Sequence, residues 1–173
     1  LARPNGRELM LGVVRDPIFG PIITFGAGGT EVEIFSDRAV ALPPLNNFLA
    51  QDLIKSTRAS KLLGEFRNMP PASIEALEEV LLNLSEMVCE LPWLQELDLN
   101  PLIVDENGAI AADARIVIDH APASGDRYSH MAIHPYPVHL IQEWQLPDGL
   151  EITIRPIRPE DAEMEKDFVS RMS

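Results

Sequence analysis

The sequence predicts an α+β fold, with a largely antiparallel sheet and two main helices on one face. Three features indicate this: short apolar runs bounded by glycine and proline, a helical repeat of leucines after them, and a second pair of strand-like runs near residue 100. Grouped strands and helices, without regular β-α alternation, are typical of this class. The 173 residues suffice for one domain with a sizeable core, or for one domain and part of another.

Residues 8–42 carry the pattern of three or four antiparallel strands. ELMLGVV and GPIITFG are apolar runs, and EVEIF alternates acidic and apolar side chains. Such alternation is typical of a strand with one solvated face, so we expect Glu31 and Glu33 to face solvent. The joining segments VRDPIFG, FGAGG and FSDR are rich in turn-forming residues.

Two helices are expected next. Asn46 or Asn47 is a suitable cap for the first, which should begin near Phe48, and RASKLLGEF allows a further helical stretch. The second helix ends before Pro92 and should pack its apolar stripe on the sheet. The stripe recurs at spacings of three and four: Ile74, Leu77, Leu81, Leu84, Val88 and Leu91.

The stretch QELDLNPLIVDENGAIAADARIVID predicts two strands joined by a tight turn at DENG. Asp98 and Asn100 are two residues apart, so a strand directs both to one face. A hairpin then brings Asp113 close to Asn100. Two carboxylates and one amide oxygen form an oxygen-only set of the kind that Mg²⁺ prefers.

A simpler interpretation of these residues is also open. Asp98 and Asn100 would face solvent on a half-exposed sheet, and Asp113 would pair with Arg115. Spacing alone favours this interpretation, because polar alternation is common on antiparallel sheets.

The composition and periodicity of the chain change after Asp119. Residues 120–149 hold all four histidines and little periodicity, which predicts a linker with some packed pieces. His130 and His134 are four apart, but nearby prolines disfavour a helix that would pair them on a metal. Residues 150–173 give a strand and an acidic helix start. We therefore divide the chain into a domain at 1–119, a linker at 120–149 and the start of a second domain at 150–173.

Composition excludes several classes of function. A net charge of −13 argues against nucleic-acid binding, because that affinity comes from clustered cations. Cys89 stands alone, so no disulfide framework or multi-cysteine metal site is expected. Without a long apolar run or a signal pattern, we expect a cytoplasmic protein that does not bind membranes. The chain does not open with Met, and we expect it to be part of something longer.

ELDLNPLIV followed by ADARIVID resembles the end of the ATP-grasp domain in nucleoside-diphosphate-forming acyl-CoA synthetases, relatives of the succinyl-CoA synthetase beta subunit. ELMLGVVRDPIFGPIITFGAGGTEVEIFSD is similar to the same family, so the resemblance covers roughly residues 8–119 and implies the domain's carboxy-terminal lobe. It implies that Asn100 and Asp113, with Asp98 as acidic partner, hold the Mg²⁺ of bound ATP or ADP. CoA or acyl-CoA would bind the parent protein through domains outside this chain.

The glycines of GAGG admit two interpretations. A bare hairpin turn is the simpler one, since GAGG matches neither a Walker loop nor a dinucleotide fingerprint. In the family that the chain resembles, a loop at this place faces the active site. The resemblance therefore implies a phosphate-side loop at Gly26, Gly28 and Gly29, whose main-chain amides can hold an anion.

LEITIRPIRPEDAEMEKDFVSRMS resembles the first strand and helix start of a GNAT acetyltransferase domain, as found behind synthetase-like regions in bacterial protein lysine acetyltransferases. This implies a fusion protein in which the chain supplies magnesium-nucleotide ligands for phosphoryl transfer by an ADP-forming acyl-CoA ligase. The alternative is a catalytically silent regulatory module of an acetyltransferase. We assign no catalytic residue, expect the chain alone to be inactive, and expect exposed core surface to allow a homodimer.

Overall fold

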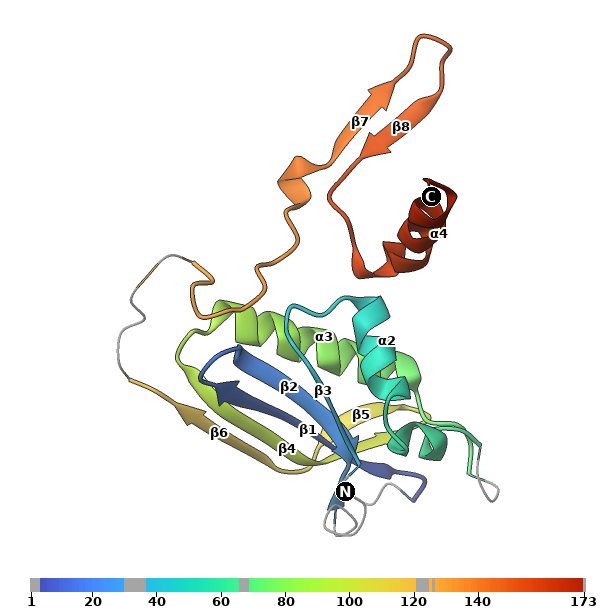
Figure 1. Cartoon of the computed structure of the whole chain (residues 1–173). Helices are drawn as coiled ribbons and strands as arrows, with labels where there is room; N and C mark the ends of the chain where they lie inside the picture. The colour runs from blue at the N-terminus through green and yellow to red at the C-terminus, as the bar shows by residue number, and fades with distance from the viewer. Residues whose placement is uncertain (1–3, 30–36, 66–68, 121–124, 126, 173) are drawn as a thin grey trace. The chain divides into compact units, whose positions relative to one another are not determined.

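The computed structural model describes residues 4–29, 37–65, 69–120, 125 and 127–172 (Figure 1). These residues divide into two compact units, Leu1–His134 and Pro135–Ser173. Within the described residues, no helix is both long enough and apolar enough to cross a bilayer.

A single antiparallel sheet forms the centre of the first unit. Its strand order is β3-β2-β1-β4-β5, and β6 pairs with β4 beyond the end of β5. The sheet confirms the predicted antiparallel architecture, although the EVEIF segment with Glu31 and Glu33 lies outside the described residues. The strands are β1 Arg7–Asp16, β2 Gly20–Ala27, β3 Arg38–Ala41, β4 Leu94–Asp105, β5 Gly108–Ala111 and β6 Ala114–Ile118.

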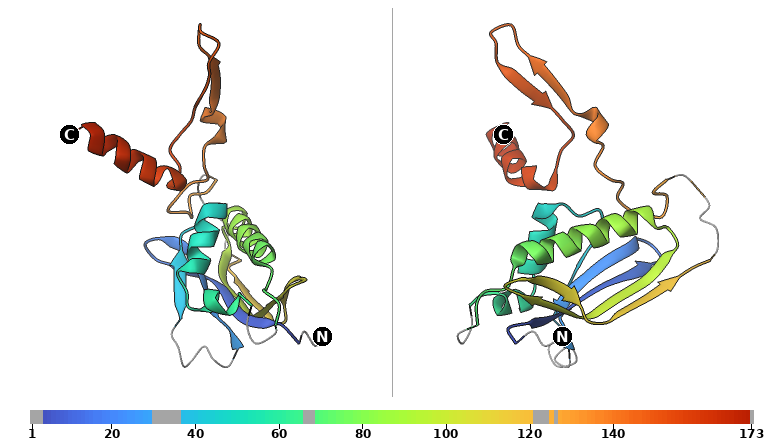
Figure 2. Two further views of the ribbon diagram at one scale, coloured as in Figure 1. Left: turned by 90° about the vertical axis from the view of Figure 1, so that its right-hand side faces the viewer. Right: turned by 180° about the vertical axis from the view of Figure 1, so that it is seen from behind.

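Two α-helices cover one face of this sheet, as Figure 2 shows. Helix α2 spans Asn47–Lys55, and the side chain of Asn46 caps it by accepting from the amide of Leu49. Helix α3 spans Ile74–Glu90 and is capped by Ser73. The RASKLLGEF segment forms only a short 3₁₀ helix, η2, at Ala59–Leu62.

The core lies between α3 and the central strands. Alternate side chains of β1, those of Leu9, Leu11 and Val13, are buried against the helical layer, as the period of two requires. On α3 the middle of the predicted stripe is buried, whereas Ile74 at its start is 47% exposed. Burying each of the fully buried leucines of β1 and α3 stabilises the fold by about 1.5–3 kcal/mol.

The strand that returns after the DENG turn is not continuous, which corrects the sequence-based expectation of one strand over AIAADARIVI. It divides into β5 and β6, separated by Ala112 and Asp113. The break faces Asn100 and Pro101, and the amide of Ala112 donates to the carbonyl of Pro101 at 3.0 Å. On the other side of β4, the register with β1 shifts between Leu9 and Leu11. Both neighbours of β4 are therefore irregular at the same place.

The second unit is a hairpin followed by a helix. Strands β7 (Gln142–Gln145) and β8 (Glu151–Ile154) pair antiparallel, and η4 (Pro159–Asp161) leads into α4 (Ala162–Met172). The segment expected to be a linker thus contains β7 and a 3₁₀ turn, η3, at Val138–Leu140. Strand β7 has only four residues, and all of them are exposed. Its sequence therefore lacks the alternation of apolar and polar residues that identifies a strand.

Candidate functional site

Asn100 lies at the irregular place in β4, where both neighbouring ladders shift. Its side-chain oxygen Oδ1 accepts a hydrogen bond from the main-chain amide of Gly29, with an N–O distance of 3.0 Å. The side chain is partly buried. Gly29 belongs to the glycine segment GAGG, and Asn100 belongs to the NPL hairpin, which consists of β4 with β5 and β6. The sequence indicated these two residues separately, and the structure brings them into direct contact.

Asp113 occupies the break between β5 and β6. Strand register pairs Leu99 with Ala114 and Leu102 with Ala111, which places Asp113 across from Asn100 and Pro101. The Asp113 carboxylate is exposed and accepts from the amide of the next residue, Ala114, at 3.0 Å. Its second oxygen is not used in that bond.

Asp98 lies two residues before Asn100, on an exposed position of β4. The strand places Gly12 beside it on β1 and Arg115 beside it on β6. Because Leu97 is buried under the helices, Asp98 points to the opposite face of the sheet. In the described part of the chain, its carboxylate forms no hydrogen bond or ion pair.

The simpler interpretation of the sequence required Arg115 to pair with Asp113, and this prediction is wrong. The Arg115 guanidinium contacts Glu96 instead, with Nη2 3.7 Å from Oε2. Both side chains are more than half exposed, so this ion pair contributes little stability. Arg115 therefore does not engage the carboxylate of Asp113.

The three candidate glycines have different surroundings. Gly26 belongs to β2, where a Cβ would lie 2.1 Å from the main-chain oxygen of Asp37. Gly28 donates its amide to the carbonyl of Glu8 at 2.9 Å, which extends the β1–β2 pairing past the end of β2. Only Gly29 turns its amide toward a candidate ligand, Asn100. The β2–β3 connection, residues 28–37, is longer than a two-residue hairpin turn.

Glu8 is a site neighbour that the sequence patterns did not single out. It stands on an exposed position of β1, and its carboxylate occupies the space that a side chain at Gly29 would need. Glu8 lies far from Gly29 in sequence and has no motif of its own. Only the pairing of β1 with β2 could have indicated it.

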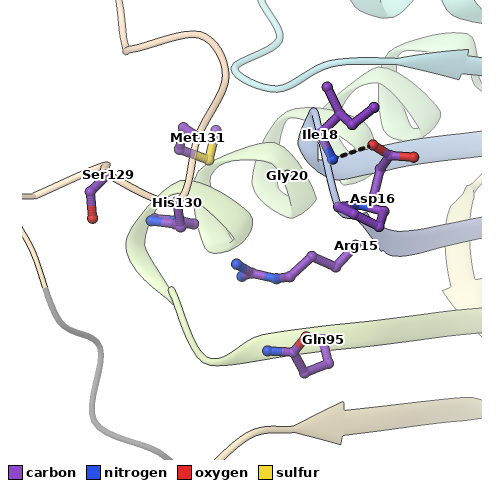
Figure 3. A pocket seen from close by; sticks show the side chains of 9 residues that line it. Arg15, Asp16, Ile18, Gly20, Gln95, Ser129, His130 and Met131 are labelled. Carbon is purple, nitrogen blue, oxygen red and sulfur yellow. Dashed lines mark hydrogen bonds between the residues drawn. The ribbon is translucent and has the colours of Figure 1, made fainter.

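A separate pocket of about 470 Å³ lies at the other end of β1 (Figure 3). Arg15 contributes to its lining and donates from Nη2 to the carbonyls of Pro92 and Leu94, at 2.7 and 3.0 Å. Burial lowers the pKa of Arg15, and the charge of Asp119 opposes this. The pocket is lined by Arg15, Asp16, Pro17, Ile18, Gly20, Gln95, Ser129, His130 and Met131.

Nothing in this pocket coincides with the predicted site. Ring nitrogen Nε2 of His130 lies 3.0 Å from the carbonyl oxygen of Val88, so this histidine holds the segment after β6 against the end of α3. The Asp16 carboxylate accepts from the amides of Phe19 and Ile18, which lowers its pKa. These contacts close the hairpin tip and the helix end, and we interpret the pocket as the junction between them.

Any cation at the NPL hairpin would need ligands beyond acidic side chains. Among the described residues, no group of three histidine, cysteine, aspartate or glutamate side chains is placed to hold a metal. An amide oxygen from Asn100 and oxygens from a bound phosphate are the donors that would complete such a shell.

Comparison with known proteins identifies relatives of the first unit. A family model described as an ATP-grasp domain matches residues 1–118. The acetate–CoA ligase (ADP-forming) I subunit beta of Pyrococcus furiosus is 39% identical over 115 residues, 66% of this chain and 50% of that protein. The 4-hydroxybutyrate–CoA ligase (ADP-forming) of Nitrosopumilus maritimus is 39% identical over 104 residues, 60% of this chain and 15% of that protein.

A solved structure supports the same relationship. The dinucleotide forming acetyl-coenzyme A synthetase 1 of Ca. Korarchaeum cryptofilum, in complex with coenzyme A and Mg-AMPPCP, is 41% identical with a TM-score of 0.65. The match covers 69% of this chain and 55% of that chain. The present chain therefore spans about half the length of the P. furiosus and Korarchaeum proteins.

Proposed function

Because the chain belongs to the ATP-grasp domain family, we propose that Asn100, Asp113 and Asp98 hold the magnesium ion of a bound nucleotide. The domain is of the type found in ADP-forming acetyl-CoA synthetase-like proteins. The observation that carries the proposal is the bond from the Gly29 amide to Asn100 Oδ1, which joins the glycine segment to the NPL hairpin.

The donor set suits magnesium. Two carboxylates and one carboxamide oxygen are hard ligands, and magnesium takes few protein ligands while it keeps water and phosphate oxygens. Asn100 is partly buried and hydrogen-bonded, so its oxygen is held in place, whereas the carboxylates of Asp98 and Asp113 are exposed and can approach a ligand. When bound, the ion would offset phosphate charge during phosphoryl transfer.

The chain's own residues have two tasks in this proposal. Asn100 and the acidic side chains orient the nucleotide phosphates, and the amide of Gly29 faces the same corner of the sheet. Gly26 and Gly28 allow neighbouring main-chain segments to approach closely, since a Cβ at either position would meet main-chain atoms. The whole protein would link ATP, an acyl phosphate and an acyl-CoA, with CoA or acyl-CoA bound outside this chain.

The test is a titration of the ¹⁵N-labelled chain with Mn²⁺ in the presence of ADP. Many acidic side chains bind Mn²⁺ weakly on a chain of net charge −13, so the criterion is where the signals broaden first. We expect the amide signals of Gly29 and Ala114 to broaden before others. The double variant Asn100→Leu and Asp113→Leu should lose this early broadening.

The matched control is Glu151→Leu, which removes one exposed strand carboxylate in the second unit. It should leave the pattern unchanged. Early broadening that persists in the double variant, or that is centred on other residues of the wild-type chain, would contradict the proposed site.

A second candidate function concerns the second unit. We propose that it is the start of a GNAT domain, and that the ATP-grasp lobe then acts as a regulatory module of a protein lysine acetyltransferase. The supporting observation is that β8 leads through a turn, closed by the Arg155–Asp161 ion pair, into α4 within a separate compact unit. The test is lysine acetyltransferase activity of the chain expressed together with its flanking genomic sequence. Absence of acetyl transfer in that protein would contradict this candidate.

A further inference from the structure

We propose that Gly29 is a positioning residue for Asn100, and that it acts best as glycine because its backbone is left-handed and the Glu8 carboxylate lies where a side chain would stand. The proposal rests on the proposed magnesium site, which Asn100 would serve. It concerns the metal-free chain, however, and it is testable there. Three residues on β1, the β2–β3 connection and β4 would then act together.

The first step concerns the orientation of the Asn100 carboxamide. The two ends of an asparagine side chain differ in chemistry, because Oδ1 accepts hydrogen bonds and Nδ2 only donates them. The Gly29 amide is a donor, so it selects the rotation that directs Oδ1 toward it, at 3.0 Å. The opposite rotation would bring two donors together. The bond thus keeps the oxygen, rather than the NH₂ group, facing Gly29.

The bond from Gly29 leaves Asn100 Oδ1 able to accept a second contact. A carboxamide oxygen has two lone pairs, and the Gly29 amide uses one of them. The other remains for a ligand. Because rotation about the last side-chain bond of asparagine is soft, an unsupported carboxamide would populate both orientations. A fixed donor removes this disorder before any ligand arrives.

The second step concerns the absence of a side chain at Gly29. Its φ of +68° lies in the left-handed region, which disfavours residues with a Cβ. A Cβ there would also lie 2.0 Å from Oε2 and 3.2 Å from Cδ of Glu8. The exposed Glu8 side chain can rotate away from such a Cβ, so the left-handed φ is the larger obstacle to a side chain at this position.

The third step concerns how the amide is held in place. Gly28 donates to the main-chain carbonyl of Glu8 at 2.9 Å, so the start of the connection is attached to β1. Glu8 in turn pairs with Ile103 of β4. The same strand therefore fixes the backbone beside Gly29 and occupies the space of its missing side chain. If Gly29 moved away from Glu8, its amide would leave Asn100.

The experiment measures two quantities in the metal-free chain. The first is hydrogen exchange of the Gly29 amide in the wild type, in Asn100→Leu and in Asn100→Asp. Asn100→Leu removes the acceptor and should speed exchange on the order of tenfold. Asn100→Asp keeps an acceptor oxygen and should retain the protection. Exchange of the core amides of Leu9 and Phe25 serves as the folding control.

The second quantity is the ¹⁵N relaxation of the Asn100 side-chain NH₂ group. In the wild type it should be ordered, in contrast to exposed Asn83, and in Gly29→Ala it should approach the mobility of Asn83. The double variant Glu8→Ala and Gly29→Ala removes the carboxylate that a Cβ would meet but not the left-handed strain, so it should recover only part of the order. Glu8→Ala alone should leave Asn100 ordered. Recovery by a second substitution is not expected from a general loss of stability.

Two results would overturn the proposal: equal exchange of the Gly29 amide in wild type and Asn100→Leu, or an equally ordered Asn100 side chain in Gly29→Ala. Because neither measurement involves a metal, these results bear on positioning alone. A wild-type chain with an ordered Asn100 but no localised Mn²⁺ broadening would contradict the magnesium site and leave the positioning role intact.

Discussion

Arg7 donates from Nη2 to the main-chain oxygen of Pro70 at 2.7 Å. This bond ties the first residue of β1, next to Glu8, to the segment that leads into α3. Three further bonds extend from the same guanidinium, to the carbonyls of Asn5, Leu62 and Gly64. The side chain is only 6% exposed, and its buried positive charge is compensated by carbonyl oxygens alone among the described residues.

Arg7→Met should therefore destabilise the first unit strongly. The substitution keeps an apolar stem but leaves several buried carbonyls without a donor, and hydrogen bonds to charged groups contribute about 1.5–3 kcal/mol each. We expect a loss of about 3 kcal/mol or more, measured by urea unfolding. Arg38→Met, on an exposed position of β3, is the matched control and should change stability by less than about 0.5 kcal/mol. Equal effects of the two would contradict the role of Arg7.

Ser85→Ala should reveal how the helical layer holds the segment before α2. Ser85 is buried on α3, and its Oγ accepts from the amide of Leu45 at 2.7 Å. Alanine leaves that partly buried amide without its partner, and the loss of a buried partner costs about 1–3 kcal/mol. Urea unfolding measures the loss, and Ser170→Ala on the exposed helix α4 provides the comparison. A loss below about 0.5 kcal/mol at Ser85 would show that water replaces the bond.

Much of the fold could be predicted from local pattern. The stripe on α3 has a period of 3.6, and its burial follows from that spacing alone. The cap of α2 was predicted as Asn46 or Asn47, and the structure selects Asn46, whose side chain bonds an amide three residues away. Both features depend on residues close together in the sequence.

What sequence could not predict are contacts between distant segments. The Gly29–Asn100 bond spans 71 positions, so neither the glycine motif nor the NPL motif contains it. The break at Ala112 and Asp113 depends on the irregular register of β4 rather than on the alternation of AIAADARIVI, which suits one strand. In the sequence, Arg7 looks like any cation at the end of a strand. Its buried role depends on the carbonyls of Gly64 and Pro70, which are distant in the sequence.

The Cys89 thiol should be unreactive at neutral pH. Burial chiefly, with the charges of Glu90 and Glu86, raises its pKa to about 11. At pH 8 the thiolate fraction is then about 100-fold below that of a thiol with the ordinary value, and only the thiolate reacts. Iodoacetamide labelling followed by mass spectrometry should be correspondingly slow in the folded chain and fast in urea. Rapid labelling of the folded chain would contradict the buried position.

The same thiol predicts the sign of a pH dependence. The folded state keeps the thiol proton up to about pH 11, whereas the unfolded chain loses it near the ordinary cysteine pKa of 9.0. The unfolded state therefore binds fewer protons in this window, and the Cys89 contribution to stability is present below pH 9 and is lost as pH rises toward 11. Cys89→Ala should flatten the decline in unfolding free energy across this range.

Asp161 should titrate unusually low. The Arg155 guanidinium donates to both of its oxygens at 2.7 Å, and together with the Arg158 amide this lowers the Asp161 pKa to about 2. The pair's contribution to the second unit is thus present above pH 4 and is lost as pH falls toward 2. The ¹³C shift of the carboxyl carbon measures the midpoint. Arg155→Gln should raise it, whereas Arg171→Gln, which breaks a different pair on α4, should not.

We propose, finally, that the purified chain self-associates through α4. Met164, Phe168 and Met172 recur every four residues on this helix, and each is more than 60% exposed. In a solution of this chain alone, a second copy is the partner available to cover such a stripe. Light scattering after size-exclusion chromatography should show a mass that rises with concentration.

The helix offers a matched pair of variants for this last test. Phe168→Glu places a charge in the apolar stripe and should shift the chain toward the monomer, because burying an unpaired carboxylate is costly. Ser170→Glu adds the same charge on the opposite side of α4, two residues on, and should leave the mass unchanged. A monomeric wild-type chain at all concentrations would refute self-association. Equal effects of the two glutamates would instead assign it to net charge rather than to the apolar stripe.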